Sequence, residues 1–105
     1  IGILPSDKIE DGNAHSSIII PTGIGFARSQ VLVNSIDGGI AIEGGLGTRE
    51  EAGLMYWLKK PLVAIATTGG TAEEIADKQL DKRNHPKILS ADNAKEAVSL
   101  LLSKI

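Results

Sequence analysis

A run of glycines lies where an apolar segment ends and a helical pattern begins. Residues 39–42 (Gly-Ile-Ala-Ile) indicate a buried strand, and residues 44–51 follow as Gly-Gly-Leu-Gly-Thr-Arg-Glu-Glu. Glycine lets the backbone approach a ligand closely, and a helix N-terminus presents N–H groups that have no intrahelical acceptor. The segment therefore predicts a phosphate cradle formed by Gly44, Gly45, Leu46, Gly47 and Thr48.

The same run has a structural interpretation. Thr48 is a good N-cap residue, and Glu51 stands three positions later, which is the spacing of a capping box. One carboxylate cannot easily both cap a helix and act on a substrate. Glu51 is therefore either a capping residue or a reactive one, and the sequence leaves both readings open.

Further candidates lie elsewhere in the chain. The turn Thr22-Gly23-Ile24-Gly25 is either a loop that lines a ligand or a plain strand exit. Arg28 follows this glycine-rich turn, which favours a role facing a phosphate or carboxylate over a surface salt bridge. Residues 67–71 are interpreted as a turn with a helix beginning at Thr71. His15 and His85 have no partners at ligand spacing, so we expect no metal site.

Short apolar runs alternate with helical patterns along the whole chain. We predict strands at residues 1–4, 17–20, 39–42, 62–66 and 87–89, and helices at 27–35, 48–58, 71–78 and 91–104. Repeated strand–helix units imply parallel strands joined by right-handed crossovers. The prediction is a single α/β domain over residues 1–105, a Rossmann-like three-layer sandwich with a mostly parallel sheet. Ligands bind such sheets at the carboxyl ends of the strands, where the glycine-rich turns lie.

Composition limits the classes of function. The chain has 105 residues, 42% apolar residues, a formal net charge of −2 and no cysteine. It has no basic surface for nucleic acid and no apolar stretch long enough for a membrane span, so we expect a cytoplasmic protein with neither partner. The apolar strand at residues 1–5 opens without a methionine, and we expect the fold to be N-terminally incomplete. Residues 54–58 (Leu-Met-Tyr-Trp-Leu) carry more apolar surface than one helix face buries, which predicts a homodimer or homotetramer.

The glycine-rich run resembles a known signature. Residues 44–51 are similar to the Pro-Gly-Gly-x-Gly-Thr-x-x-Glu motif of the Lonely Guy superfamily, whose cytokinin-activating phosphoribohydrolases were long labelled lysine decarboxylases. Arg28 precedes the motif at a spacing typical of that superfamily. Residues 22–28 (Thr-Gly-Ile-Gly-Phe-Ala-Arg), with Asp37, are more similar still to the branch that contains the molybdenum-cofactor carrier proteins.

The chain also departs from these patterns. Glu43 stands where the phosphoribohydrolases carry proline, and Ser29 where they carry lysine and the carrier-like branch usually carries asparagine. An added carboxylate and a missing cation both weaken the binding of an anion.

The resemblance implies two functions. The first is a carrier-like binding protein that holds a nucleotide or a molybdopterin-type ligand and requires no other cofactor. The second is an enzyme that cleaves the N-glycosidic bond of a nucleoside 5′-monophosphate, with Arg28 and Glu51 as its catalytic residues. Glu43 and Ser29 favour the first function. The sequence spacing between Arg28 and Glu51, which is typical of the superfamily, favours the second. A degenerate copy without any ligand is a third alternative.

Overall fold

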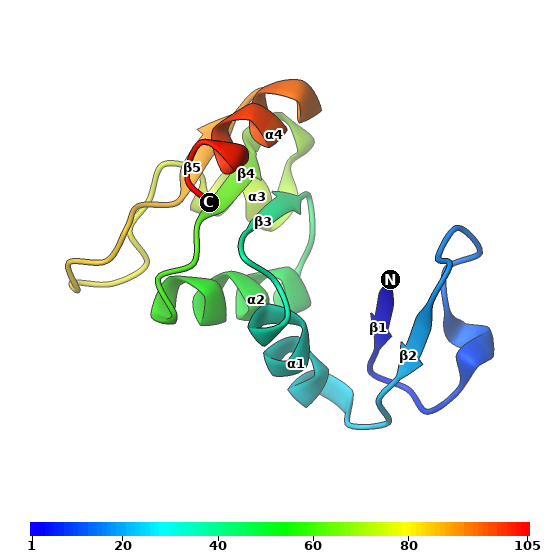
Figure 1. The fold of residues 1–105 in the computed structure, drawn as a ribbon. Coiled ribbons are helices and arrows are strands. Elements are labelled where there is room, and N and C mark those ends of the chain that lie inside the picture. The colour runs from blue at the N-terminus through cyan, green and yellow to red at the C-terminus, as the bar shows by residue number, and fades with distance from the viewer. The chain divides into compact units, whose positions relative to one another are not determined.

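The computed structural model describes all 105 residues, which form two compact units, Ile1–Ser35 and Ile36–Ile105 (Figure 1). Strands alternate with helices along the chain, and every strand pair is parallel. This arrangement confirms the predicted α/β class.

The first unit is built on two short parallel strands. Strand β1 (Gly2–Leu4) pairs with β2 (Ile19–Pro21), and Gly2 lies opposite Ile19. A 3₁₀ turn at Ile9–Asp11 lies between them, and a second 3₁₀ turn at Gly25–Ala27 leads into helix α1 (Arg28–Asn34). Both strands were predicted from their apolar runs, with ends that differ by one or two residues.

The second unit contains a three-stranded parallel sheet in the order β3-β4-β5. The strands are β3 (Gly39–Ile42), β4 (Leu62–Ile65) and β5 (Leu89–Ala91). Every residue of the central strand β4 is buried. This burial explains why β4 has no polar alternation, because a central parallel strand is covered on both faces.

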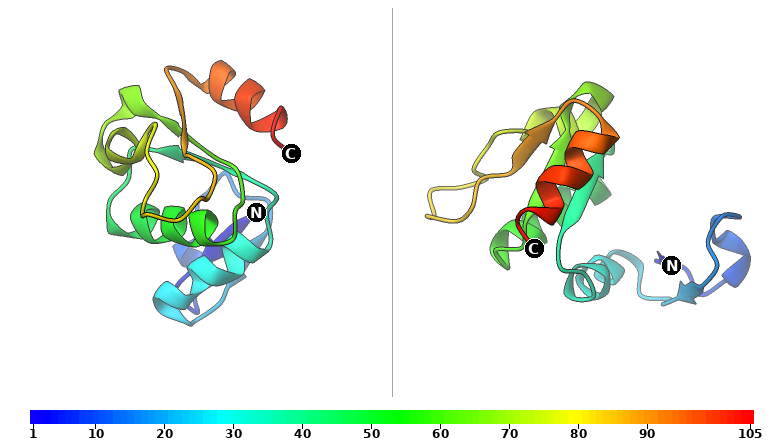
Figure 2. Two further views of the ribbon diagram at one scale, coloured as in Figure 1. Left: turned by 90° about the vertical axis from the view of Figure 1, so that its left-hand side faces the viewer. Right: turned by 45° about the horizontal axis from the view of Figure 1, so that its top comes forward.

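Helices cover both faces of this sheet (Figure 2). Ile40, Val63 and Leu89 lie side by side in the strand register. They pack with side chains of helix α4 (Ala94–Leu102), namely Ala97, Leu100 and Leu101. Gly39 belongs to the opposite face, because successive residues of a strand alternate. A Cβ there would lie 2.9 Å from the sulfur of Met55, on helix α2 (Leu46–Trp57).

Several elements end or begin two or three residues from their predicted positions, and in two of them the backbone shows why. Helix α3 (Gly70–Ile75) stops before residue 78, because Ala76 is extended and Asp77 is left-handed, with a φ of 61°. Strand β5 begins at Leu89 because the N–H of Ile88 instead donates to the carbonyl of Lys78, at 3.0 Å.

Helix α4 has the capping motif that was predicted for α2. The Asn93 side chain accepts a hydrogen bond from the N–H of Glu96, at 2.9 Å. The Glu96 carboxylate in turn accepts from the N–H of Asp92, at 2.8 Å. Reciprocal bonds of this kind hold a helix N-terminus in place.

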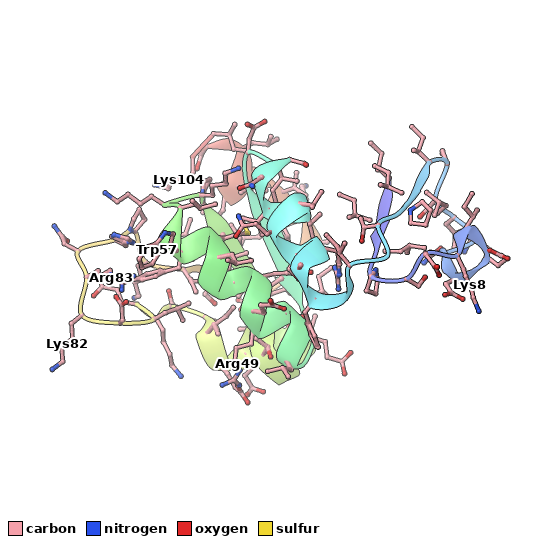
Figure 3. All side chains as sticks on the ribbon, turned by 90° about the horizontal axis from the view of Figure 1, so that it is seen from below. Lys8, Arg49, Trp57, Lys82, Arg83 and Lys104 are labelled. Carbon is pink, nitrogen blue, oxygen red and sulfur yellow. The ribbon has the colours of Figure 1, made fainter.

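The apolar end of α2 divides between core and surface. Met55 and Tyr56 are buried, whereas Trp57 is 60% exposed. The guanidinium of Arg83 lies 4.2 Å from the centre of the Trp57 ring, and Figure 3 shows the two side chains together. Arg83 belongs to the segment between α3 and β5, whose His85 Nδ1 lies 2.9 Å from the carbonyl oxygen of Tyr56. His85 therefore holds this segment against α2.

Candidate functional site

The glycine-rich segment leaves β3 at the carboxyl edge of the sheet. Glu43 and Gly44 both have positive φ values, 47° and 86°. Gly45 follows as the N-cap residue, and α2 begins at Leu46. Two successive left-handed residues reverse the chain so sharply that the helix begins soon after the strand ends.

The predicted cap at Thr48 is wrong. The N-cap residue is Gly45, no side chain caps the helix, and Thr48 lies within its first turn. The physical reason is the left-handed backbone of Gly44, which starts the helix earlier than side-chain preference indicates. Glu51 is consequently well inside the helix and does not belong to a capping box.

The carbonyl groups of this turn point into the protein. The carbonyls of Glu43 and Gly44 accept hydrogen bonds from the N–H groups of Ala72 and Thr71, both at 2.9 Å. The Thr71 hydroxyl donates to the carbonyl of Gly45, also at 2.9 Å. The N-terminal amides of α3 thus serve to hold the glycine-rich turn and are not free for a ligand.

A second threonine joins the exits of two neighbouring strands. The N–H of Glu43 donates to Thr68 Oγ1 at 2.7 Å, and the same hydroxyl donates to the carbonyl of Ile65 at 2.6 Å. Thr68 and Thr71 were interpreted from the sequence as part of a plain turn. Their position directly after β4 could have indicated that they bind the glycine-rich turn, because the carboxyl ends of adjacent parallel strands lie at one edge of the sheet.

The N–H groups of the turn have the opposite orientation. Leu46, Gly47 and Thr48 are the first three residues of α2, so their N–H groups have no acceptor within the helix, and they form no hydrogen bond elsewhere in the chain. No heavy atom lies within 4 Å of where a Cβ of Gly45 or Gly47 would be. The turn therefore presents open, unpaired donors at the positive end of a helix dipole, an arrangement that suits an anion.

Charged side chains surround this turn. Arg49 forms an ion pair with Glu74 of α3, and both side chains are more than half exposed (Figure 3). The Glu43 side chain is exposed as well. Glu51 lies four residues after Gly47, so the two residues share one face of the helix.

The other predicted site residues belong to the first unit. The Thr22 hydroxyl donates to the carbonyl of Leu4 at 2.6 Å, and the N–H groups of Gly23 and Gly25 donate to the carbonyls of Ser6 and Pro5. These donors are engaged in holding the exit of β1. A role of this turn in lining a ligand stays a prediction.

Arg28 begins helix α1 and is partly buried. Its neighbour Ser29 is fully buried. A lysine at position 29 would bring an ammonium group into a buried position, which is costly without a partner. The small, neutral serine is therefore consistent with its buried surroundings. A role of Arg28 in binding a ligand stays a prediction.

Comparisons with known proteins place these features in a family. A family model described as the SLOG cluster4 family matches residues 1–98. The X-ray structure of TM1055, a structural genomics target, is similar with a TM-score of 0.87 and 34% sequence identity, over 97% of this chain. The chain spans 62% of that protein's length. No curated protein matches it significantly. No helix here has the length and apolar character that a membrane span requires.

Proposed function

Because the chain belongs to the SLOG cluster4 family, a Rossmann-like family of the Lonely Guy superfamily, we propose that it binds a nucleotide or a phosphorylated cofactor without transforming it. The observation that carries this proposal is the row of unpaired N–H groups at Leu46, Gly47 and Thr48. A phosphate held there has backbone donors and a helix dipole in its favour. Glu43 and Ser29, which depart from the phosphoribohydrolase pattern, favour binding over catalysis.

The proposed ligand is a phosphate ester with an extended organic part. The phosphate would accept hydrogen bonds from the N–H groups of the turn. A nucleotide and a molybdopterin-type cofactor share this chemistry. The molybdopterin-type cofactor is included because residues 22–28 resemble the carrier-like branch of the superfamily.

Replacing Gly45 by valine tests the cradle. A Cβ at this position meets no heavy atom within 4 Å, so the variant should fold, while its side chain occupies the path by which a phosphate reaches the N–H groups. We expect the affinity for nucleoside 5′-phosphates such as AMP, measured by isothermal titration calorimetry, to fall at least about tenfold, or about 1.4 kcal/mol.

Gly53→Ala is the matched control for this variant. Gly53 lies in the same helix and also has open space at its Cβ. Alanine there should leave AMP affinity unchanged and raise helix stability by about 1 kcal/mol. A folded Gly45→Val protein that binds AMP as tightly as the original chain excludes the turn as the phosphate site.

The second candidate function is hydrolysis of nucleoside 5′-monophosphates. The observation that favours it is the position of Glu51 inside helix α2, four residues after Gly47 and outside any capping box. In this alternative the turn anchors the 5′-phosphate, and the Glu51 carboxylate stabilises the positive charge that develops on the ribose as the N-glycosidic bond breaks.

Glu51→Gln separates the two functions. If the chain is a hydrolase, the amide keeps the shape of the side chain but loses the charge, so release of free base should drop at least about a hundredfold while AMP affinity stays within about twofold. Base release is measured by chromatography. A chain that binds AMP and releases no base leaves only the binding function.

We also propose that the chain assembles as a homodimer or homotetramer. Trp57 and Leu58 at the end of α2 are exposed, and Val98, Leu102 and Ile105 are exposed apolar residues of the C-terminal segment. Exposed apolar area of this kind is typical of an interface. Light scattering at micromolar concentration should return a mass of two or four chains, and a monomeric mass contradicts the proposal.

A further inference from the structure

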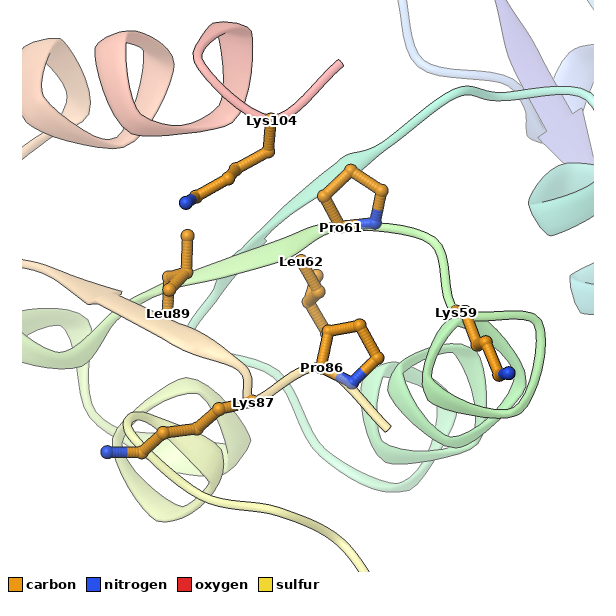
Figure 4. A pocket seen from close by; sticks show the side chains of 7 residues that line it. All are labelled: Lys59, Pro61, Leu62, Pro86, Lys87, Leu89 and Lys104. Atoms are coloured by element: carbon orange, nitrogen blue, oxygen red, sulfur yellow. The ribbon is translucent and has the colours of Figure 1, made fainter. Parts of the chain in front are cut away.

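A pocket lies at the edge of the β3-β4-β5 sheet that is opposite to the glycine-rich turn. Its volume is about 320 Å³, and residues at the amino ends of β4 and β5 line it (Figure 4). Pro61 and Leu62 come from the start of β4, and Pro86 and Leu89 flank the start of β5. These four side chains give the pocket an apolar floor. A volume near 300 Å³ is at the lower end of the range for small-molecule sites.

The charged side chains of this pocket are all lysines. Lys59, Lys87 and Lys104 line it, and no acidic residue does. Lys87 forms a 3.7 Å ion pair with Asp77, whereas Lys59 and Lys104 have no carboxylate partner in the chain. In Figure 4 the Lys104 side chain reaches across toward Leu89. Lys59 and Lys87 border the pocket, and their side chains extend outward from it.

We propose that this pocket is a second ligand site, for a small organic anion with an apolar body. The proline and leucine side chains cover the apolar body, and the ammonium group of Lys104, which reaches across toward Leu89, attracts the anionic end, while the unpaired Lys59 adds positive charge at the border of the pocket. A neutral apolar molecule would leave both charges without a partner. A polar anion such as inorganic phosphate would leave the apolar floor uncovered. The apolar side chains and the lysine charges together therefore select an anion that has an apolar body.

The site is independent of the proposed nucleotide site. Parallel strands place their amino ends at one edge of the sheet and their carboxyl ends at the other. The pocket occupies the first edge and the glycine-rich turn the second. Both ligands can therefore bind one chain at the same time, without competition.

The test uses the probe 8-anilinonaphthalene-1-sulfonate, which joins aromatic rings to one negative charge. Fluorescence titration of the whole chain should show saturable binding. Lys104→Gln should weaken it about threefold to fivefold, and the double variant Lys59→Gln/Lys104→Gln about tenfold, because each removes one exposed charge. Lys82→Gln, at an exposed lysine outside the pocket, should have no effect. N-phenyl-1-naphthylamine, the same rings without the sulfonate, should bind all variants equally.

A competition experiment locates the probe. Excess AMP should leave the sulfonate probe bound, and Gly45→Val should bind it normally. Displacement by AMP overturns the proposal, because it assigns the probe to the nucleotide site. Equal affinity of the original chain and the double lysine variant, or no saturable binding, overturns it as well. The comparison of the lysine variants does not depend on whether the chain binds AMP, so the two proposals fail separately.

Discussion

Gly44→Ala is expected to destabilise the protein by about 3 kcal/mol, because two costs add at this position. A Cβ on Gly44 would lie 2.5 Å from the Cβ of Thr48, which no rotation of the threonine side chain relieves. The φ of 86° is also unfavourable for any residue with a side chain. In thermal unfolding followed by circular dichroism, the midpoint should fall by roughly 15 °C.

Gly45→Ala is the matched control for Gly44→Ala. Gly45 is the next residue in the same turn, but its φ is −124° and no atom crowds its Cβ. Its unfolding midpoint should stay within a few degrees of the original value, since the predicted change is under about 1 kcal/mol. Equal losses of stability at both positions contradict the left-handed turn described here.

Glu43→Pro is expected to cost at least about 3 kcal/mol, although it restores the proline of the Lonely Guy motif. Proline fixes φ near −65°, whereas Glu43 has a φ of 47°. Proline also has no N–H, so the 2.7 Å hydrogen bond to Thr68 Oγ1 is lost. Urea unfolding should show a correspondingly lower free energy of unfolding.

Glu43→Gly isolates the backbone from the side chain. Glycine adopts positive φ without strain and keeps the N–H, so its stability should remain within about 1 kcal/mol of the original. It also removes a carboxylate beside the proposed phosphate site, and AMP affinity should rise by a few fold. If Glu43→Pro is as stable as Glu43→Gly, then a positive φ at position 43 is not what distinguishes this chain from the proline-containing motif.

Apolar periodicity was sufficient to predict the elements of the fold. The run Leu62–Ile65 lacks polar alternation because it forms the central strand, and residues 39–42 coincide with β3. The end of α3 could not be predicted, because it depends on the left-handed backbone of Asp77, a conformation that aspartate tolerates but does not require. The pairing of Leu89 with Val63 likewise depends on the neighbouring strand.

The candidate site was predicted less completely. Its glycines indicated a turn, but the start of α2 depends on two positive φ values, and one of them belongs to a glutamate. Side-chain preference therefore favoured Thr48 as the cap over Gly45. The hydrogen bonds of the Thr68 and Thr71 hydroxyls to this turn join residues that are 25 and 26 positions apart in the sequence. A local pattern carries no information about such contacts.

The outward N–H groups of Leu46, Gly47 and Thr48 have a consequence for the environment in which the protein works. Peptide N–H groups do not ionise in the physiological range, unlike a histidine or a lysine at a phosphate site. A cradle made of them keeps the same donors at every pH at which the chain is folded. Any pH dependence of phosphate affinity would then come from the ligand, whose second ionisation lies at about 6. If phosphate binds there as proposed, the selectivity of the turn is built into the main chain and does not depend on the side chain at position 46.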